Sequence, residues 1–452
     1  MTAFPPTPFP RKGGDGGSSL RDSMLLAVPA LGRPGSGHPF FGRRGLAMNA
    51  VLQPKPNYIV CDGNEAAAWA VSLAQVDMVA VYPITPQSSL VEYLAKFIAD
   101  GRLGAEIVDV EGEHSVLSVL QGATLAGART YTASCGPGLA FMFEPYMRTP
   151  GMRLPMVMTI VTRDTLTPQS VWGGHQDAMS VREVGWIQIY CENLQEILDT
   201  TIMAYRIAEH HDVMLPVNVC HDGNYLSFAT GRVELPDAAE VAAFLGQRDV
   251  NWHVALDPDR PMAVDPLTGG AGGPGPALFV RYRKGQCQGM QNSLAVIEEV
   301  HADWARRFGR HHAPLVEAYR MDDAELALVT LGSMTGAAKD AVDEARARGQ
   351  KVGLAKVKTY RPFPAKKLAE ILAPVKAVAV VDRSVSFGWN CGPLYQDTLA
   401  ALQASNIPAM SCIGGLAGAD ITITHFARVI EACAELAEKR SPVDTLWLNE
   451  HD

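Results

Sequence analysis

Two strand ends in the first half of the chain carry residues that could do chemistry. The apolar run from Val79 to Tyr82 predicts a buried strand, and the turn Pro83-Ile84-Thr85-Pro86 follows it directly. Each proline fixes its own φ and lacks an N–H, so Thr85 is expected on a stiff turn. Its hydroxyl can donate to a ligand carboxylate or phosphate, or it can hydrogen-bond its own backbone in the turn.

An acid follows the next predicted strand. The run Ile107–Val110 has strand character, and Glu113 then begins an apolar helix that is predicted to continue to Ala126. A buried carboxylate is suited to proton transfer. A glutamate at a helix start can also serve only the helix dipole or a capping box, so this alternative stays open.

A third candidate is Arg163, which follows the very apolar strand Pro155–Val161. Its planar fork can bind both oxygens of a carboxylate, and an ion pair with Asp164 or Asp177 is the alternative. The nearby loop Trp172–Asp177 has two glycines, one histidine and one aspartate. These residues make a poor metal site, so the loop is either a pocket lid or an ordered connection.

The elements that must position these residues alternate between strand and helix. This alternation predicts an α/β fold with a parallel sheet, in which ligands bind at the carboxyl ends of the strands. We expect a disordered extension over residues 1–47, a first α/β unit over 57–230, a connecting segment with a surface helix over 231–320, and a second, smaller α/β unit over 321–440. A start of synthesis at Met48 is the alternative for the extension.

Composition excludes several classes of function. The chain has 452 residues, 47% of them hydrophobic, and a formal net charge of −9, which gives no support to nucleic-acid or anionic-membrane binding. Its eight cysteines form no C-x-x-C pair, so we expect unpaired thiols in a reducing cytosol and no iron–sulfur cluster in this chain. No glycine-rich phosphate loop is present either.

Six ordered blocks make the chain similar to the α subunit of the 2-oxoacid:ferredoxin oxidoreductases, the pyruvate:ferredoxin oxidoreductase family. The resemblance runs from about Asn57 to Ala434. The blocks are Gly63–Ala66, Tyr82–Gln87, Val110–Ser115, Gly185–Gln188, Tyr360–Pro364 and Asp382–Gly388.

The resemblance implies a pyrimidine-type thiamine diphosphate-binding domain at 57–230 and a transketolase C-terminal-like domain at 321–440. It implies that Glu113 hydrogen-bonds the aminopyrimidine N1′ in a proton relay and that Pro83 and Ile84 lie at the cofactor. Thr85 and Arg163 match the positions that hold the substrate carboxylate. The implied reaction is oxidative decarboxylation of a 2-oxoacid to its acyl-CoA.

The same resemblance implies a cytoplasmic heteromeric complex. A β subunit would carry the diphosphate and Mg²⁺ site and an iron–sulfur cluster, beside γ and ferredoxin-like δ subunits. Coenzyme A would take the acyl group, and electrons would pass to ferredoxin, or to NAD through a flavoprotein. No metal is expected in this chain. The alternatives are a non-catalytic assembly subunit and a transketolase-like thiamine enzyme, and the latter would need its own diphosphate motif.

Two stretches depart from the family pattern. Cys135–Gly138 stands where many relatives carry Ser-Gln, and Trp172-Gly173-Gly174-His175 stands where pyruvate-type relatives often carry Trp-Asn-Asp-His. Glycines near the substrate would enlarge the pocket. The expected substrate is therefore pyruvate or, as these glycines favour, a bulkier aryl or branched 2-oxoacid such as phenylglyoxylate.

Overall fold

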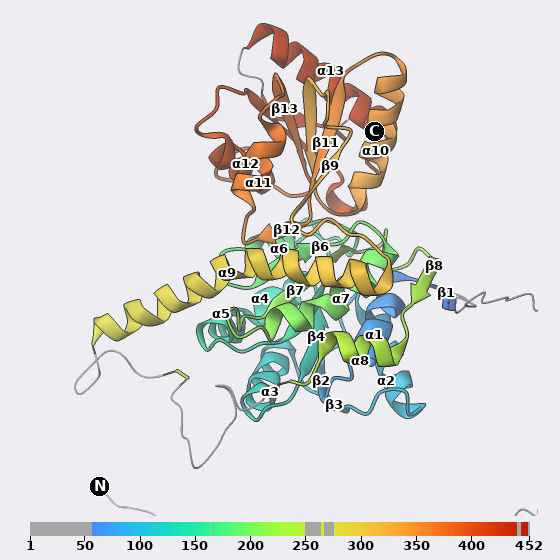
Figure 1. The fold of residues 1–452 in the computed structure, drawn as a ribbon, viewed down its shortest axis with the longest axis vertical. Helices are drawn as coiled ribbons and strands as arrows, with labels where there is room; N and C mark the ends of the chain where they lie inside the picture. The colour runs from blue at the N-terminus through green and yellow to red at the C-terminus, as the bar shows by residue number, and fades with distance from the viewer. Residues whose placement is uncertain (1–56, 166, 249–263, 266–274, 441–443, 451–452) are drawn as a thin grey trace, which may run out of the picture. The chain divides into compact units, whose positions relative to one another are not determined.

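The computed structural model describes residues 57–165, 167–248, 264–265, 275–440 and 444–450. It contains two largely parallel sheets, of seven and six strands, which confirm the predicted α/β class (Figure 1). The predicted extension over residues 1–47 lies outside the described residues. The predicted domain boundaries stay predictions.

The seven-stranded sheet has the order β12-β6-β7-β5-β4-β2-β3, and its strands are parallel except for β12, which runs antiparallel to β6. Strands β4 to β7 are buried along their whole length, so they form the centre of the sheet. The strands are β2 (Met78–Val81), β3 (Glu106–Asp109), β4 (Thr130–Ser134), β5 (Val157–Thr162), β6 (Ile187–Tyr190), β7 (Val217–Asp222) and β12 (Thr359–Arg361).

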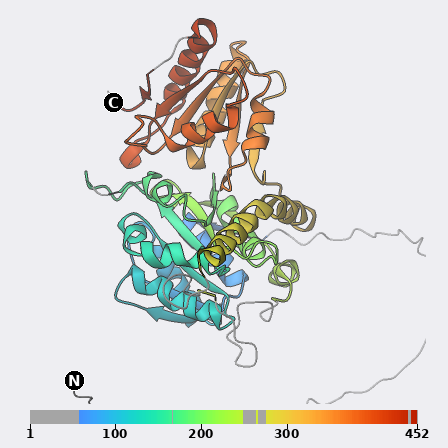
Figure 2. The same ribbon diagram turned by 90° about the vertical axis from the view of Figure 1, so that its left-hand side faces the viewer.

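The six-stranded sheet has the order β15-β14-β13-β10-β11-β9, with only β9 antiparallel. Its strands are β9 (Val316–Tyr319), β10 (Leu326–Thr330), β11 (Val352–Val357), β13 (Ala377–Asp382), β14 (Ala409–Ile413) and β15 (Leu446–Trp447). Figure 1 shows α11 and α12 on one face and α10 and α13 on the other, and Figure 2 shows these layers from the side. A separate antiparallel pair joins β1 (Asn57–Cys61) to β8 (Gly231–Leu235).

Thirteen α-helices are found in the described part of the chain. They are α1 (Gly63–Leu73), α2 (Ser88–Ala99), α3 (Glu113–Leu125), α4 (Pro137–Phe141), α5 (Phe143–Gly151), α6 (Gln176–Ser180), α7 (Leu194–Ala208), α8 (Ala238–Leu245), α9 (Pro276–Phe308), α10 (Thr335–Ala347), α11 (Ala365–Leu372), α12 (Pro393–Leu402) and α13 (Ile423–Lys439). None of the described helices is long and apolar enough to cross a membrane.

Most predicted elements are confirmed, with three shifted starts. The apolar run Pro155–Val161 predicts β5 and the run Val213–Val219 predicts β7, but the strands begin two and four residues later, at Val157 and Val217. Pro155 and Pro216, just before these starts, have no N–H to donate to a neighbouring strand. The surface helix of the connecting segment, for which the spacing of apolar residues predicts Ser293–Phe308, begins at Pro276 instead. Its first three turns are largely exposed, so no apolar period marks them in the sequence.

A buried ion network ties α7 to β11. The Glu196 carboxylate accepts from Lys356 Nζ at 2.8 Å and lies 3.1 Å from Lys358 Nζ, and all three side chains are buried. Burial alone would raise the pKa of Glu196, but Lys358 and Lys356 outweigh it and hold this pKa well below its usual range. The network therefore stabilises the fold at pH values above about 4.5 and loses this contribution in acid.

We expect Glu196→Gln to lower the free energy of unfolding by about 1–3 kcal/mol, because Lys358 loses its carboxylate partner, while Lys356 keeps Glu192 at 2.6 Å and Glu317 at 3.2 Å. Urea unfolding at pH 7 followed by circular dichroism measures this loss. The matched change is Glu435→Gln on α13, whose exposed partner Lys439 lies 2.9 Å away and contributes little. Equal effects of the two changes would contradict the stabilising role of the network.

Candidate active site

The predicted residues converge on one short segment after β4, residues 135–138, which we call the hub loop. A Cβ added to Gly136 would lie 2.2 Å from Arg163 Nε. A Cβ added to Gly138 would lie 2.7 Å from Glu113 Oε1. Gly136 also has a φ of +48°, which disfavours any side chain. The two glycines let the end of β5 and the start of α3 approach each other closely.

Thr85 is exposed and lies on the predicted turn, which is fixed by hydrogen bonds. Gln87 Nε2 donates to the Tyr82 carbonyl at 2.9 Å, and the Thr85 carbonyl accepts from Arg163 Nη1 at 2.6 Å. Cys135 Sγ of the hub loop lies 3.1 Å from the same carbonyl. Within the described residues the Thr85 hydroxyl has no hydrogen-bond partner, so the alternative of a self-bonded turn threonine is wrong and the hydroxyl is available to a ligand.

Arg163 is buried, with 4% of its surface exposed. Its guanidinium donates to the Thr85 carbonyl through Nη1, while its Nε has no partner. The predicted ion pairs with Asp164 and Asp177 are not formed in the part of the chain that the structure describes. Asp177 instead accepts from the Arg163 backbone N–H at 3.1 Å. The guanidinium is therefore anchored on the Thr85 turn through Nη1, and its Nε–H is among the donors that remain unused.

Glu113 is the first residue of α3 and is only 5% exposed. The helix has Gly112 at its N-cap with no side-chain cap bond, so the alternative of a capping box is wrong. No described residue hydrogen-bonds the Glu113 carboxylate, and the buried Ser134 Oγ beside Gly138 also has no partner. Buried polar groups almost always have partners, so these two point to a ligand that supplies hydrogen-bonding groups.

Such a ligand fits the aminopyrimidine of thiamine diphosphate, which offers ring nitrogens and an amino group. Ile84 of the Thr85 turn contacts the hub loop, since its carbonyl lies 3.8 Å from Cys135 Sγ. Pro83 is exposed and Ile84 is half-buried. The chain has no diphosphate motif, so only the pyrimidine end of the cofactor fits its residues.

The loop Trp172–Asp177 is an ordered connection. His175 Nε2 lies 2.5 Å from Asp222 Oδ1, and Arg383 Nη1 donates to the same oxygen at 3.1 Å. A Cβ on Gly173 would lie 2.5 Å from the Gly223 carbonyl, and one on Gly174 would collide with Asp164. The idea that these two glycines enlarge a substrate pocket is therefore wrong, because the chain's own atoms fill the space beside them.

Sequence reasoning missed Asp177 as part of the site. Its carboxylate is fully buried and accepts three backbone N–H groups, from Gly136 at 2.7 Å, Arg163 at 3.1 Å and Ala178 at 2.7 Å. Burial raises its pKa to about 7, against the lowering effect of these hydrogen bonds. The one signal in the sequence is the glycine–proline–glycine run of the hub loop, which indicates that other segments approach the backbone closely at this point.

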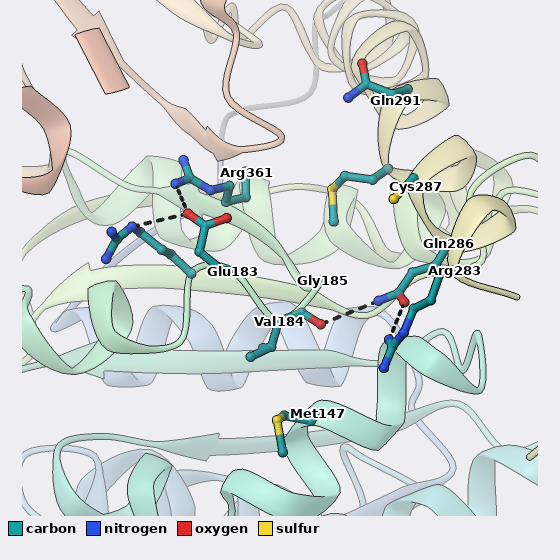
Figure 3. Close-up of a pocket in the computed structure, with 11 residues that line it drawn as sticks. Met147, Glu183, Val184, Gly185, Arg283, Gln286, Cys287, Gln291 and Arg361 are labelled. Atoms are coloured by element: carbon teal, nitrogen blue, oxygen red, sulfur yellow. Dashed lines mark hydrogen bonds and ion pairs between the residues drawn. The ribbon is translucent and has the colours of Figure 1, made fainter. Parts of the chain in front are cut away.

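A cavity of about 530 Å³ lies away from these residues (Figure 3). It is lined by Met147 of α5, the segment 182–185, α9 and Arg361 of β12. Figure 3 shows Arg361 facing Glu183, and the two side chains are 2.5 Å apart. None of the predicted site residues lines this cavity. The one described group with metal-ligand geometry is His210, His211 and Asp212 on the surface, also outside the site.

Comparisons with known proteins agree with this geometry. Residues 69–273 match the family "Pyruvate flavodoxin/ferredoxin oxidoreductase, thiamine diP-bdg", and residues 324–426 match "Pyruvate:ferredoxin oxidoreductase core domain II". All strands of the seven-stranded sheet except β12 thus lie in a thiamine diphosphate-binding domain.

Two curated relatives are similar over almost their whole length. The NADH-dependent phenylglyoxylate dehydrogenase subunit alpha of Aromatoleum evansii is 69% identical over 90% of this chain and 98% of its own. The pyruvate synthase subunit PorA of Methanocaldococcus jannaschii is 41% identical over 86% of this chain and 97% of its own. The chain therefore belongs to the pyruvate:ferredoxin oxidoreductase family, as the α subunit of a multisubunit 2-oxoacid oxidoreductase.

A solved structure supports the fold. The 2-oxoglutarate:ferredoxin oxidoreductase from Magnetococcus marinus superposes with a TM-score of 0.65 at 20% identity, over 84% of this chain and 66% of that one. The family resemblance and the fold predicted from the sequence are confirmed.

Proposed function

We propose that this α subunit forms one wall of a thiamine diphosphate site in which a 2-oxoacid is oxidatively decarboxylated to its acyl-CoA. The observation that carries the proposal is Glu113, a buried carboxylate with no partner among the described residues, beside the equally unpartnered Ser134 hydroxyl. When bound, thiamine diphosphate supplies the stabilisation of negative charge that decarboxylation needs. Glu113 holds a proton at the aminopyrimidine N1′, and Pro83 and Ile84 contact the ring.

Two further residues orient the substrate in this proposal. The exposed Thr85 hydroxyl and the Arg163 guanidinium donate to the substrate carboxylate. Nη1 of Arg163 already holds the Thr85 carbonyl at 2.6 Å, so the two donors move together as one unit. Fixing the carboxylate this way aims the 2-oxo carbon and lowers the entropy cost of reaction.

The rest of the machinery is proposed to lie in partner chains. A β subunit supplies the diphosphate and Mg²⁺ site and an iron–sulfur cluster, and γ and ferredoxin-like δ subunits complete the complex. Support comes from the missing diphosphate motif and from cysteines that are all unpaired, seven of them buried. Such thiols also support a cytoplasmic location. Electrons then reach ferredoxin, or reach NAD through a flavoprotein. The words "NADH-dependent" in the name of the Aromatoleum relative support a nicotinamide acceptor.

Cofactor titration tests the shared site. Isothermal titration of thiamine diphosphate with Mg²⁺ should give no measurable heat with the α subunit alone and a saturable signal with the co-purified αβ pair. Tight binding by the α subunit alone, or none by the pair, would contradict a site built from two chains.

The proposed substrate is an aryl 2-oxoacid, and its preference is measurable on the purified complex. We expect kcat/KM for phenylglyoxylate to exceed that for pyruvate by at least about tenfold, because a pocket that buries an aryl ring gains little from a methyl group. The 69% identity to the Aromatoleum relative supports this choice over pyruvate. A substrate panel with NAD and with ferredoxin as acceptors measures both preferences, and a clear preference for pyruvate would refute the aryl assignment.

A further inference from the structure

We propose that Asp177 is the positioning residue of this site: its carboxylate sets the hub loop and the end of β5 so that Glu113 and Arg163 face the same ligand. This inference rests on the proposed function of Glu113 and Arg163. It adds a residue that touches neither cofactor nor substrate and acts through the backbone.

The contacts of Asp177 join three separate segments. A single oxygen, Oδ2, accepts from Gly136 N at 2.7 Å and from Arg163 N at 3.1 Å, while Oδ1 accepts from Ala178 N at 2.7 Å. The first two donors lie 41 and 14 residues away in the sequence. A carboxylate that only capped its own short helix would need neither of them.

The cost of burying Asp177 argues that these contacts matter. The side chain is fully buried, and no lysine, arginine or histidine of the described residues forms an ion pair with it. An uncompensated buried carboxylate destabilises a fold, and backbone N–H groups are then its only source of stabilisation. Keeping an ionisable carboxyl here is more costly than an amide or an apolar residue would be, which is typical of groups kept for a functional site.

The hub loop connects Asp177 to the Arg163 guanidinium and to the Glu113 carboxylate. Gly136 has a φ of +48°, and a Cβ there would lie 2.2 Å from Arg163 Nε. Two residues later, Gly138 packs against Glu113 Oε1. Because both contacts are tight, a shift of the Gly136 N–H away from Asp177 displaces the arginine fork and the Glu113 carboxylate together.

The helix that carries Asp177 is itself held from the six-stranded sheet. Gln176 Nε2 donates to the Val385 carbonyl at 3.1 Å, and the Val385 N–H donates to Gln176 Oε1 at 2.8 Å. Val385 follows β13. On this inference, the second α/β unit serves the first site by fixing α6.

The principal test is Asp177→Asn in the full complex, with turnover normalised to assembled complex and bound thiamine diphosphate. The amide keeps the volume but loses one acceptor oxygen, so we expect kcat to fall about tenfold to hundredfold, the scale of a small misplacement of reacting groups, and KM for the 2-oxoacid to rise. The melting temperature at pH 8 should change little, since a buried charge is removed as well.

Asp382→Asn is the matched control. Asp382 is also buried, accepts two backbone N–H groups, from Leu394 at 2.8 Å and Tyr395 at 3.1 Å, and has its pKa raised by burial to about 7. It lies at the end of β13, and its carboxylate hydrogen-bonds no described residue of the site. Turnover per complex should therefore stay at the wild-type value. An equal loss in both variants, or wild-type kcat and KM in Asp177→Asn, overturns the inference.

A pH profile separates positioning from folding. Protonation of Asp177 below about pH 7 turns one acceptor oxygen into a donor, so the wild-type advantage in kcat over Asp177→Asn should shrink between pH 8 and pH 6. A constant ratio overturns the inference. The titratable or charged groups that face this carboxylate are Arg163 and Asp164 after β5, Cys135 of the hub loop, Tyr146 of α5, Tyr190 of β6 and Cys220 of β7.

A second variant covers the case in which Asp177→Asn fails to assemble. Gln176→Met removes both bonds to Val385 and leaves the carboxylate in place, and it should lower kcat several-fold and raise KM. Unchanged kinetics overturns the inference. A different result contradicts the proposed function: if Glu113→Gln keeps its full rate, the role of Glu113 is wrong. If Glu113→Gln is slow and Asp177→Asn is fully active, only the positioning role of Asp177 is wrong.

Discussion

Replacing Glu113 by glutamine is expected to lower the turnover of the complex by about 10²- to 10⁴-fold, the range that a positioned acid–base group contributes. Glutamine has nearly the same shape, so the packing against Gly138 survives, but an amide cannot hold a proton at the aminopyrimidine N1′. Steady-state rates with a 2-oxoacid, coenzyme A and an electron acceptor measure the loss. Thiamine diphosphate binding should change much less than kcat.

Glu111→Gln is the control for this change. Glu111 lies two residues earlier, is exposed and hydrogen-bonds Ser115, so its replacement removes the same charge without touching the site. Full activity of Glu113→Gln would mean that the carboxylate is structural and would favour a non-catalytic assembly role for the subunit. Loss of assembly in both variants would point to a general effect of charge.

Gly136→Ala is expected to have the second largest effect. Its Cβ would lie 2.2 Å from Arg163 Nε and 2.9 Å from Arg163 Cζ, and the residue has a φ of +48° that disfavours any side chain. Either the hub loop or the arginine must move. We expect KM for the 2-oxoacid to rise about tenfold to hundredfold, since the substrate carboxylate loses a properly aimed donor.

Gly101→Ala separates the contact from the backbone strain. Gly101 also has a positive φ, +70°, but a Cβ there would meet nothing within 4 Å. It should lower the melting temperature modestly and leave KM unchanged. If Gly136→Ala changes stability but not KM, Arg163 does not hold the substrate.

Much of this arrangement was predictable because strand ends in a parallel sheet share one edge. The Thr85 turn, Glu113 and Arg163 each follow an apolar run in the sequence, and the positions of those runs are enough to bring the three together. The starts of β5 and β7 were less predictable. The apolar run continues through Pro155 and Pro216, but a proline cannot donate the hydrogen bond that would extend the pairing with a neighbouring strand. The roles of Thr85, Glu113 and Arg163 came from the family motifs. The residue pattern alone left a functional and a purely structural interpretation open for each of them.

Long-range contacts made through the backbone could not be predicted in this way. Asp177 acts by accepting from the N–H groups of Gly136 and Arg163, and backbone N–H groups leave no trace in residue identity. Gly173 and Gly174 were misinterpreted for a related reason: an absent side chain can mean either open space or a close neighbour. Here the neighbours are Gly223 and Asp164, which only the folded chain brings near.

The path of β12 has a consequence for how this protein can be divided. After β11 the chain leaves the six-stranded sheet, contributes Thr359–Arg361 to the edge of the seven-stranded sheet beside β6, and then returns for α11 and β13. Neither sheet is therefore formed by one continuous segment of the sequence. A cut near residue 320 would leave β6 as a bare edge, open to pairing with other chains. A chimera of two relatives, or a pair of separately expressed halves, must therefore keep β12 together with the seven-stranded sheet.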